Sequence, residues 1–237
     1  MATTKTHKQF VTALKKLADP SAVAEVSRFF NADPNARSSD NKILGVSIGR
    51  IFPLAKQFAD LPLADIEPLL ENPYYEVRMG AVSIMDFQAR AKSTSPAHRQ
   101  ALYDLYLRRH DRINNWDLVD RAAPHVVGGY LADKPRDILY ALAKSANPWE
   151  RRTAIVSTYT FIRAGDTEET FRIAELLVSD PHELVQKAVG SWIREAGKQD
   201  EKRLLSFLRT HAKSMPRPML RYAVEKLAPA VRVKFLK

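Results

Sequence analysis

The sequence predicts an all-α protein built as a stack of paired helices. β-branched residues seldom alternate with polar ones, and the Asn-Gly and Asp-Gly pairs of tight hairpins are absent from the 237 residues. Apolar residues recur instead with the spacing of amphipathic helices. Similar turn-and-helix segments also return at regular intervals, which indicates a helical-repeat protein.

The composition indicates a folded chain with one domain. Hydrophobic residues make up 45% and charged residues 27% of the sequence, enough apolar material for a core. No Gly/Ser-rich or Pro-rich stretch divides the chain, so we expect a single repeat domain over residues 1–237. Residues 1–40 are expected to form an N-terminal helical cap.

The charge balance bears on the partner of the protein. The chain has 37 Lys and Arg against 27 Asp and Glu, and the net charge of +10 is spread along its length. This pattern favours a polyanionic partner, with a merely solvated basic surface as an equal alternative. No apolar run is long enough for a membrane span, and the N-terminus lacks a signal pattern, so we expect a cytoplasmic protein.

Individual helix ends can be placed from capping residues. Asp166 and Glu169 form a predicted capping pair for the helix around Phe171, and Gly165 is expected to stop the helix before it. Asp200 is expected to open a further helix after Gly197 has closed its predecessor. Helices of ten to fifteen residues separated by short turns follow from these signals.

The turns themselves repeat. Small-residue helices follow Asn72-Pro73, Asn147-Pro148, Asp180-Pro181 and the segment 214–219, and the segment 113–127 has the same form. Proline suits the first turn of a helix, where its missing N–H would have no partner, and Asn, Asp or Ser before it can act as a cap. The repeat length of 32 to 42 residues is that of a helical hairpin, so we predict a HEAT-like solenoid.

Aligning the repeats brings polar residues to one equivalent position. The small residues used for the alignment are Gly80, Ala122, Ala154, Ala188 and Ala223. The polar residues two places before them are Arg78, Asp120, Arg152, Gln186 and Arg221. Because the second helix of each hairpin lines the concave side of a solenoid, this column predicts a concave basic groove. For Gln186 alone, a structural hydrogen bond between repeats is the preferred interpretation.

The tryptophans lie on or near the same helices. Trp116 comes one turn before Asp120, and Trp149 three residues before Arg152, so each aromatic ring shares a helix face with its polar partner. Trp149 is expected in the core and Trp116 in the groove. The third tryptophan, Trp192, also falls on a predicted inner helix.

Motifs of several enzyme classes are missing. The sequence has no Walker, dinucleotide-binding, nucleophile-elbow or zinc-protease motif, and its six histidines have no partner at ligand spacing. The absence of cysteine excludes disulfides, thiolate catalysis and cysteine-ligated metals. We therefore expect neither a cofactor nor a metal site.

Four ordered segments resemble a known family. NNWDLVDRAAPHVVGGYL, WERRTAIVSTY, VQKAVGSWIREAGK and SMPRPMLRYAVEKL resemble the DNA alkylation repair family of AlkD-like HEAT-repeat DNA glycosylases, over roughly residues 40–237. The resemblance implies hydrolytic excision of cationic alkylated purines, such as 3-methyladenine and 7-methylguanine, from double-stranded DNA. It also implies that no metal or cofactor takes part, and that the base does not enter a pocket.

The resemblance also implies roles for individual residues. Trp116 and Asp120 match the catalytic-cleft tryptophan and aspartate of the family, and Arg152 matches its cleft arginine, which would hold a phosphate near the lesion. Further contacts to the DNA backbone are expected from Arg78, Lys187, Arg194 and Arg221. The chain is expected to act as a monomer and to associate with the nucleoid when bound to DNA.

One position departs from the family pattern. The second cleft tryptophan of the family corresponds to Ser191, whereas this chain has its tryptophan at Trp192. A shift of one residue turns a helical side chain by about 100°, so Trp192 is expected to face the core. An aromatic residue from the N-terminal part, with Phe29 as the candidate, is not assigned a place.

Three functions are therefore ranked. A glycosylase for cationic alkylpurines comes first, because Trp116, Asp120 and Arg152 are present together. A non-catalytic binder of damaged, bent or branched DNA comes second, because of the displaced tryptophan. A protein-interaction scaffold comes last, since helical-repeat grooves commonly serve that purpose.

Overall fold

The computed structural model describes residues 5–31 and 41–236, and these residues form helices joined by short turns. The one β-type pairing within these two ranges is an isolated bridge between Lys42 and Tyr74. The prediction of an all-α protein is confirmed. The chain packs as two compact units, Met1–Tyr130 (unit 1) and Leu131–Lys237 (unit 2).

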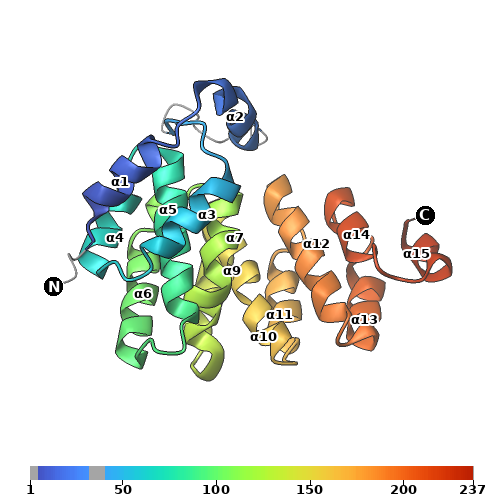
Figure 1. Ribbon diagram of the computed structural model, residues 1–237. Helices are drawn as coiled ribbons and strands as arrows, with labels where there is room; N and C mark the ends of the chain where they lie inside the picture. The colour runs from blue at the N-terminus through green and yellow to red at the C-terminus, as the bar shows by residue number, and fades with distance from the viewer. Residues whose placement is uncertain (1–4, 32–40, 237) are drawn as a thin grey trace. The chain divides into compact units, whose positions relative to one another are not determined.

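Unit 1 is organised around one long helix (Figure 1). Its α-helices are α1 (His7–Lys15), α2 (Val23–Asn31), α3 (Ile48–Gln57), α4 (Leu63–Leu70), α5 (Tyr75–Arg90), α6 (Pro96–Arg108) and α7 (Trp116–Ala123). Short helical turns lie at Pro20–Ala22, His110–Arg112, Pro124–Gly128 and Tyr130–Asp133. Helix α5 contacts α3, α4 and α7 and is buried along almost its whole length. Because α7 packs against α5, helix α5 positions the side chains of α7 that lie at the surface.

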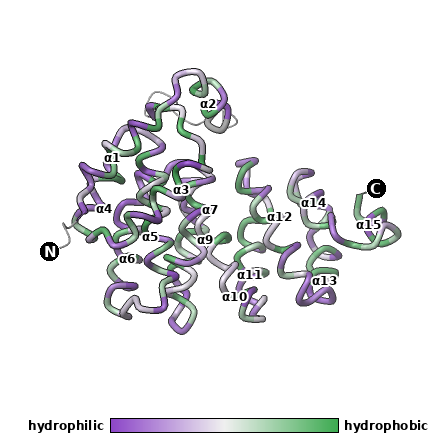
Figure 2. The backbone as a smooth tube through the Cα atoms, in the orientation of Figure 1, coloured by the Kyte–Doolittle hydropathy of each residue, from purple (hydrophilic) through white to green (hydrophobic). Residues whose placement is uncertain are grey.

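Unit 2 is also organised around one long helix, α12 (Glu183–Gly197). Its helices are α8 (Asp137–Ala143), α9 (Pro148–Ser157), α10 (Tyr159–Arg163), α11 (Glu168–Leu176), α12 (Glu183–Gly197), α13 (Glu201–His211), α14 (Arg217–Ala223) and α15 (Pro229–Leu236). Helix α12 contacts α9, α13 and α14. Hydrophobic and hydrophilic residues alternate along these helices, as amphipathic packing requires (Figure 2). None of the described helices is both long and apolar enough to cross a lipid bilayer.

Most of the predicted helix ends are confirmed. The Asn147 side chain accepts a hydrogen bond from the Trp149 N–H at 3.0 Å, and Asp200 accepts one from the Arg203 N–H at 2.9 Å. Gly165 follows α10 with a φ of +86°, the left-handed conformation that ends a helix. These features explain why α9 and α13 start, and why α10 ends, where they do.

One expectation about a helix end is wrong. The Glu169 carboxylate does not cap α11, because it accepts a hydrogen bond from the Tyr140 hydroxyl, and Thr167 is the N-cap residue. The expectation that Gly197 closes its helix is confirmed, although its backbone is not left-handed. It is the last residue of α12, and a Cβ atom there would collide with the Leu204 side chain. Gly197 thus serves close packing against α13.

Glycines also set how closely other helices approach. A Cβ atom on Gly80 would collide with the ring of Phe10, so this small residue allows α1 and α5 to pack closely. A Cβ atom on Gly190 would collide with the carbonyl oxygen of Met219 and lie 2.8 Å from the Tyr222 Cβ. Helices α12 and α14 can therefore contact each other only because residue 190 lacks a side chain.

This close approach predicts a destabilising substitution. Gly190→Ala should lower the free energy of unfolding by about 1–3 kcal/mol, because a backbone carbonyl has to move to admit the methyl group. Gly49→Ala is the matched control, since Gly49 is also helical and the nearest atom to a Cβ there is the Ser47 Oγ at 4.0 Å. Urea unfolding should show the control unchanged or stabilised by up to about 1 kcal/mol. Equal stability of both variants would contradict this packing.

Candidate functional site

Helix α7 in unit 1 carries the two residues that the sequence singles out as catalytic. Trp116 is the first residue of the helix and Asp120 follows one turn later, so their side chains lie on the same side of α7. Both residues are half-buried. A carboxylate and an aromatic ring thus lie next to each other at the surface of unit 1.

The neighbouring face of α7 is attached to α5 at its first turn. The Tyr75 hydroxyl of α5 donates a hydrogen bond to the Asp117 Oδ2, and the Asn115 amide and the Leu118 N–H donate to Oδ1 at 2.9 and 2.8 Å. Asp117 is 6% exposed. Burial, together with the nearby negative charge of Asp120, raises the pKa of Asp117 to about 6, although the bonds from Tyr75 and Leu118 act in the opposite direction.

The raised pKa predicts a pH dependence of stability. The folded protein binds a proton at Asp117 below about pH 6, whereas the unfolded chain does so only near 3.8. Between these values the folded state holds more protons, so stability falls as the pH rises, by on the order of 2–3 kcal/mol from this group. Asp117→Asn should flatten this part of the profile in urea unfolding at pH 4.5–7. A profile identical to that of the wild type would contradict the assignment.

A second attachment lies one turn further along α7. Arg121 Nη1 is 2.9 Å from the Asp86 Oδ2 of α5, and the His125 Nδ1 is 2.8 Å from the other carboxylate oxygen. The Asp86 side chain is completely buried. The Arg121 guanidinium lies over the rings of Phe52 and Phe87, 4.4 and 4.8 Å from their centroids. Asp117 and Arg121 together fix the rotation of α7, and hence the direction in which Trp116 and Asp120 point.

Arg78 does not act at the surface. Its side chain is fully buried, and its guanidinium donates to the carbonyl oxygen of Asn72 at 2.9 Å, to Asn114 at 3.3 Å and to Asn41. Burial lowers the pKa of Arg78 to about 10. The expectation that Arg78 contacts a phosphate is therefore wrong, because its donors hold the loops around α5 together.

Two further members of the polar column are buried in unit 2. Gln186 is 9% exposed and donates to the carbonyl oxygen of Asp180 at 2.8 Å, six residues back, as Arg78 does with Asn72. Gln186 thus has a structural role, as expected, but its hydrogen bond lies within one repeat and not between repeats. Arg152 is 5% exposed and donates to the Leu184 carbonyl oxygen of α12. Its phosphate contact stays a prediction.

The other tryptophans pack within unit 2. Trp149 is 7% exposed and meets the His182 ring edge-on, which confirms its place in the core. Trp192 is half-buried, and its indole N–H donates to the Val156 carbonyl oxygen at 3.0 Å. Ser191 is also half-buried. Trp192 is thus anchored to α9 by its polar edge.

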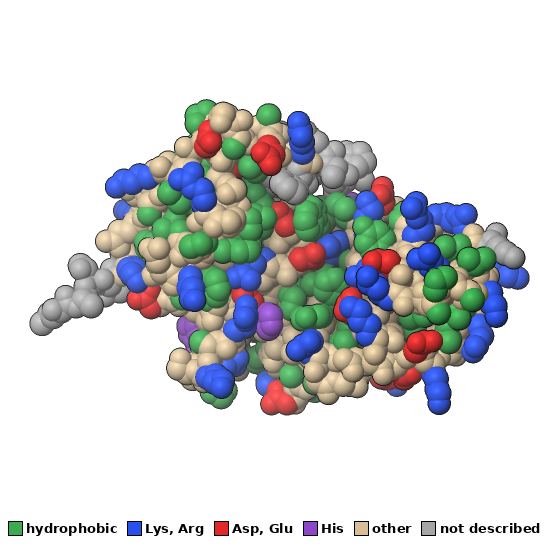
Figure 3. Space-filling model, turned by 45° about the vertical axis from the view of Figure 1, so that its right-hand side comes forward, with side chains coloured by type: hydrophobic (Ala, Val, Ile, Leu, Met, Phe, Trp, Pro, Cys, Tyr) green, Lys and Arg blue, Asp and Glu red, His purple; other side chains and the backbone are tan. Residues whose placement is uncertain are grey.

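Exposed cations gather along α12 and α14. A hollow of about 460 Å³ is lined by Lys187, Arg217, Arg221 and Tyr222, together with two glutamates. Lys187 pairs with Glu183 at 2.6 Å. On the face shown in Figure 3, Lys and Arg side chains are interspersed with acidic ones, so the net charge does not form one continuous patch there.

Arg194, the remaining predicted DNA contact, is paired with acidic side chains. Arg194 of α12 forms ion pairs with Glu225 and with Glu195, and its side chain is 18% exposed. Its availability for a phosphate stays a prediction. The candidate Phe29 has a side chain outside the part of the molecule that the structure describes. Among the described residues, no group of three or more His, Cys, Asp or Glu side chains is placed to hold a metal ion.

Comparison with known proteins identifies the family. The model of a family described as DNA alkylation repair enzyme matches residues 10–227. The chain belongs to this family. Its members are described as repair enzymes, and a role in DNA repair follows for this chain. The match begins well before residue 40, so it includes the N-terminal helices that the resemblance of motifs did not reach.

A solved structure supports the fold. The structure described as a predicted DNA alkylation repair enzyme from Enterococcus faecalis superimposes with a TM-score of 0.69 at 15% sequence identity. The alignment covers 90% of this chain and 97% of that chain. At 15% sequence identity, this structural similarity establishes the helical fold of the chain and nothing more. No curated protein matches the sequence.

The residues that hold α7 against α5 were not predicted from the sequence. Asp86 lies within an apolar stretch of α5; Arg90, four residues further on, pairs with it at 3.3 Å, but nothing nearby along the chain indicates Arg121 or His125. A signal was present on the other side, because Arg121 and His125 are four residues apart and share a helix face. Two basic groups on one face next to the expected catalytic acid point to a buried carboxylate opposite them.

Proposed function

We propose that this protein is a DNA glycosylase that hydrolyses the N-glycosidic bond of cationic alkylated purines, such as 3-methyladenine and 7-methylguanine, in double-stranded DNA. The observation that carries the proposal is the pair Trp116 and Asp120 on one side of a helix that two buried polar attachments hold in place. Membership of the repair family supports the same conclusion.

The proposed chemistry follows from the charge of the substrate. Alkylation at N3 or N7 makes the purine cationic, so the base can leave as a neutral molecule with the electron pair of the glycosidic bond. Positive charge then develops on the deoxyribose, and water adds to C1′ and loses a proton, which leaves an abasic site. Neither an external oxidant nor a reductant is required.

Each residue of the pair has a distinct role in this proposal. The Asp120 carboxylate stabilises the cationic sugar and orients the attacking water, an effect that grows when DNA excludes solvent from the surface. The Trp116 ring offers an aromatic face to the cationic nucleotide. The base is not inserted into a pocket, and the reaction uses no metal or cofactor. We expect the protein to act as a monomer, in the cytoplasm and on the nucleoid.

Phosphate binding is assigned to the basic hollow of unit 2. Arg221 and Arg217 are exposed, and with Lys187 they line one concavity, so they are suited to contact the DNA backbone. The exposed Tyr222 beside them provides a flat surface for a sugar. Arg152 of unit 2 is retained as a proposed phosphate contact.

This assignment predicts a sequence-independent loss of affinity. Arg221→Gln should weaken binding of damaged and undamaged duplexes by the same factor and reduce the slope of log affinity against log salt by about 1, because one phosphate contact is lost. Lys202→Gln removes the same charge from an exposed position on α13 and should leave the slope unchanged. Fluorescence anisotropy at several salt concentrations measures both. A loss confined to damaged DNA would contradict the assignment.

A second function is favoured by one observation. The second cleft tryptophan expected from the family is displaced by one residue in this chain, to Trp192. The Trp192 indole N–H donates a hydrogen bond to α9. A non-catalytic member would bind damaged or branched DNA through the same cations without releasing a base. Its affinity would fall steeply with salt, as in the first proposal.

One experiment separates the two functions. A duplex with a single 7-methylguanine is incubated with saturating protein, and abasic sites are counted after alkaline cleavage. Strand cleavage above the protein-free background supports the glycosylase. Binding in a parallel mobility-shift assay without any cleavage rejects the glycosylase and supports the binder.

A further inference from the structure

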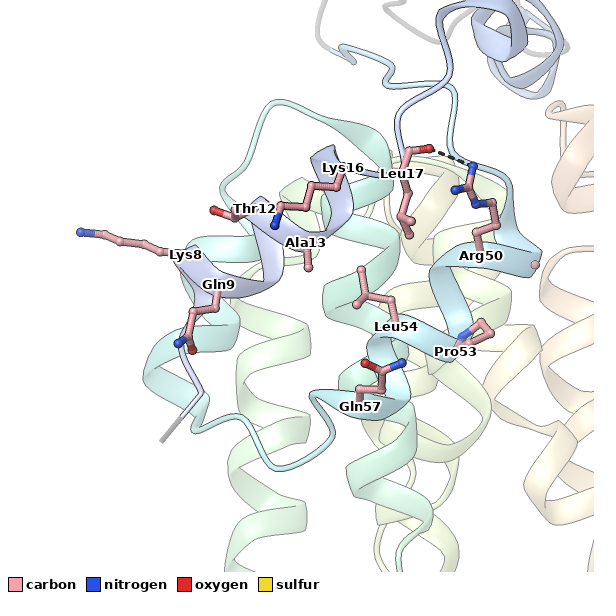
Figure 4. Close-up of a pocket in the computed structure, with 11 residues that line it drawn as sticks. Lys8, Gln9, Thr12, Ala13, Lys16, Leu17, Arg50, Pro53, Leu54 and Gln57 are labelled. Carbon is pink, nitrogen blue, oxygen red and sulfur yellow. Dashed lines mark hydrogen bonds between the residues drawn. The ribbon is translucent and has the colours of Figure 1, made fainter. Parts of the chain in front are cut away.

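A shallow groove lies between α1 and α3 in unit 1, and neither Trp116 nor Asp120 lines it. Its volume is about 760 Å³. Ala13 of α1, Leu17 just beyond α1, and Pro53 and Leu54 of α3 form an apolar floor. Figure 4 shows these side chains between the two helices, with polar residues around them. The groove is therefore an apolar strip on an otherwise polar surface.

The charged residues at the rim all have the same sign. Lys8 of α1, Lys16 directly after it and Arg50 of α3 line the groove, and the described residues that line it include no Asp or Glu. Lys8 lies in the first turn of α1, and Lys16 is its C-cap residue. Arg50 Nη1 donates to the Leu17 carbonyl oxygen at 3.1 Å, which holds the guanidinium at the opposite end of the groove from Lys8 (Figure 4).

We propose that this groove binds a short acidic amphipathic helix of a partner protein. An apolar stripe on such a helix, with side chains at positions i, i+3, i+4 and i+7, would lie on the floor formed by Ala13, Leu17 and Leu54. Carboxylates flanking the stripe would pair with Lys8, Lys16 and Arg50. The occupant therefore matches the groove in both polarity and charge.

The apolar floor distinguishes a peptide from a nucleic acid. A phosphate backbone needs cations but gains nothing from an apolar strip, whereas leucine side chains gain free energy on leaving water. The length of the groove also suits a helix. The nine residues of α1 span about 14 Å, the length of a helix of nine to ten residues.

The test uses the full-length protein and a synthetic probe. The probe is a fluorescein-labelled 12-residue peptide with four leucines at i, i+3, i+4 and i+7, glutamates beside them and alanine elsewhere. Fluorescence anisotropy should show saturable binding. A scrambled peptide of identical composition, which has no apolar stripe, should bind at least about tenfold more weakly.

Two variants test the apolar floor and the basic rim of the groove separately. Gly49→Leu places a side chain into the groove from a helical position whose Cβ has only the Ser47 Oγ nearby, at 4.0 Å, so the fold is preserved while the floor is covered. Lys8→Glu combined with Lys16→Glu reverses the rim. Each should weaken binding of the peptide about tenfold or more. Lys56→Glu, on α3 but outside the lining residues, should change it less than twofold.

Several results would overturn the proposal. These are no saturable binding, equal binding of the scrambled peptide, or unchanged binding by the Gly49→Leu variant. The proposal would also fail if a 12-base-pair duplex displaced the peptide and lost affinity with the two lysine substitutions while the peptide did not, because the groove would then bind nucleic acid. The result is independent of base release, which is measured separately.

Discussion

Replacing Asp120 by asparagine should abolish most base release while leaving DNA affinity nearly unchanged. The substitution keeps the size of the side chain and removes the negative charge that the proposed transition state needs. Loss of one such group typically costs about 10²- to 10³-fold in rate. Because the ground-state duplex gains little from a carboxylate near its phosphates, affinity should stay the same or rise slightly.

The measurement is single-turnover release of 7-methylguanine, with anisotropy for affinity. Asp104→Asn is the matched control, since Asp104 is an exposed acid on α6 and loses the same charge. The control should release base at the wild-type rate. A fall in rate of less than about fivefold for Asp120→Asn would remove this residue from the mechanism.

Of the substitutions proposed here, Asp86→Asn should lower the free energy of unfolding the most. Asp86 is completely buried between Arg121 and His125, with Arg90 at 3.3 Å, so its removal leaves basic groups at α5 without their counter-charge. Breaking a buried ion pair from one side costs about 3–5 kcal/mol. Arg121 also donates to the Ser83 Oγ at 3.1 Å, and that bond alone does not replace the carboxylate.

Urea unfolding of Asp86→Asn measures this loss. Asp111→Asn provides the comparison, because Asp111 pairs with Arg109 at the surface, where an ion pair contributes about 0–1 kcal/mol. Base release should also fall in Asp86→Asn under conditions where the protein is still folded, since α7 loses one of its two attachments. A loss of stability no larger than that of Asp111→Asn would mean that Asp86 does not hold α7.

The sequence was sufficient for the helices and several of their ends. Asn147 and Asp200 cap the helices they were expected to cap, because a capping side chain acts on an N–H two or three residues away. Such local interactions can be read along the chain. Gly197 shows the limit, since the sequence indicates that it ends a helix but not that it also leaves room for the Leu204 side chain of α13.

The polar column was harder to interpret. Repeat spacing placed Arg78, Asp120 and Gln186 at one equivalent position, but spacing gives no information on how far each side chain is buried. Arg78 and Gln186 are buried and donate to carbonyl groups of the loops before their helices, whereas Asp120 lies half-buried on α7. Arg121 and His125, the distant partners of Asp86, were not predicted for a related reason, because they lie 35 and 39 residues away along the chain.

The most direct test of the central claim compares a cationic and a neutral lesion. Single-turnover release of 7-methylguanine is measured beside release of hypoxanthine from a duplex of the same sequence, with chelator present, and the free bases are identified by mass spectrometry. The proposed mechanism predicts release of 7-methylguanine and no detectable release of hypoxanthine. Equal rates for both bases, or no release of either from fully bound DNA, would contradict it.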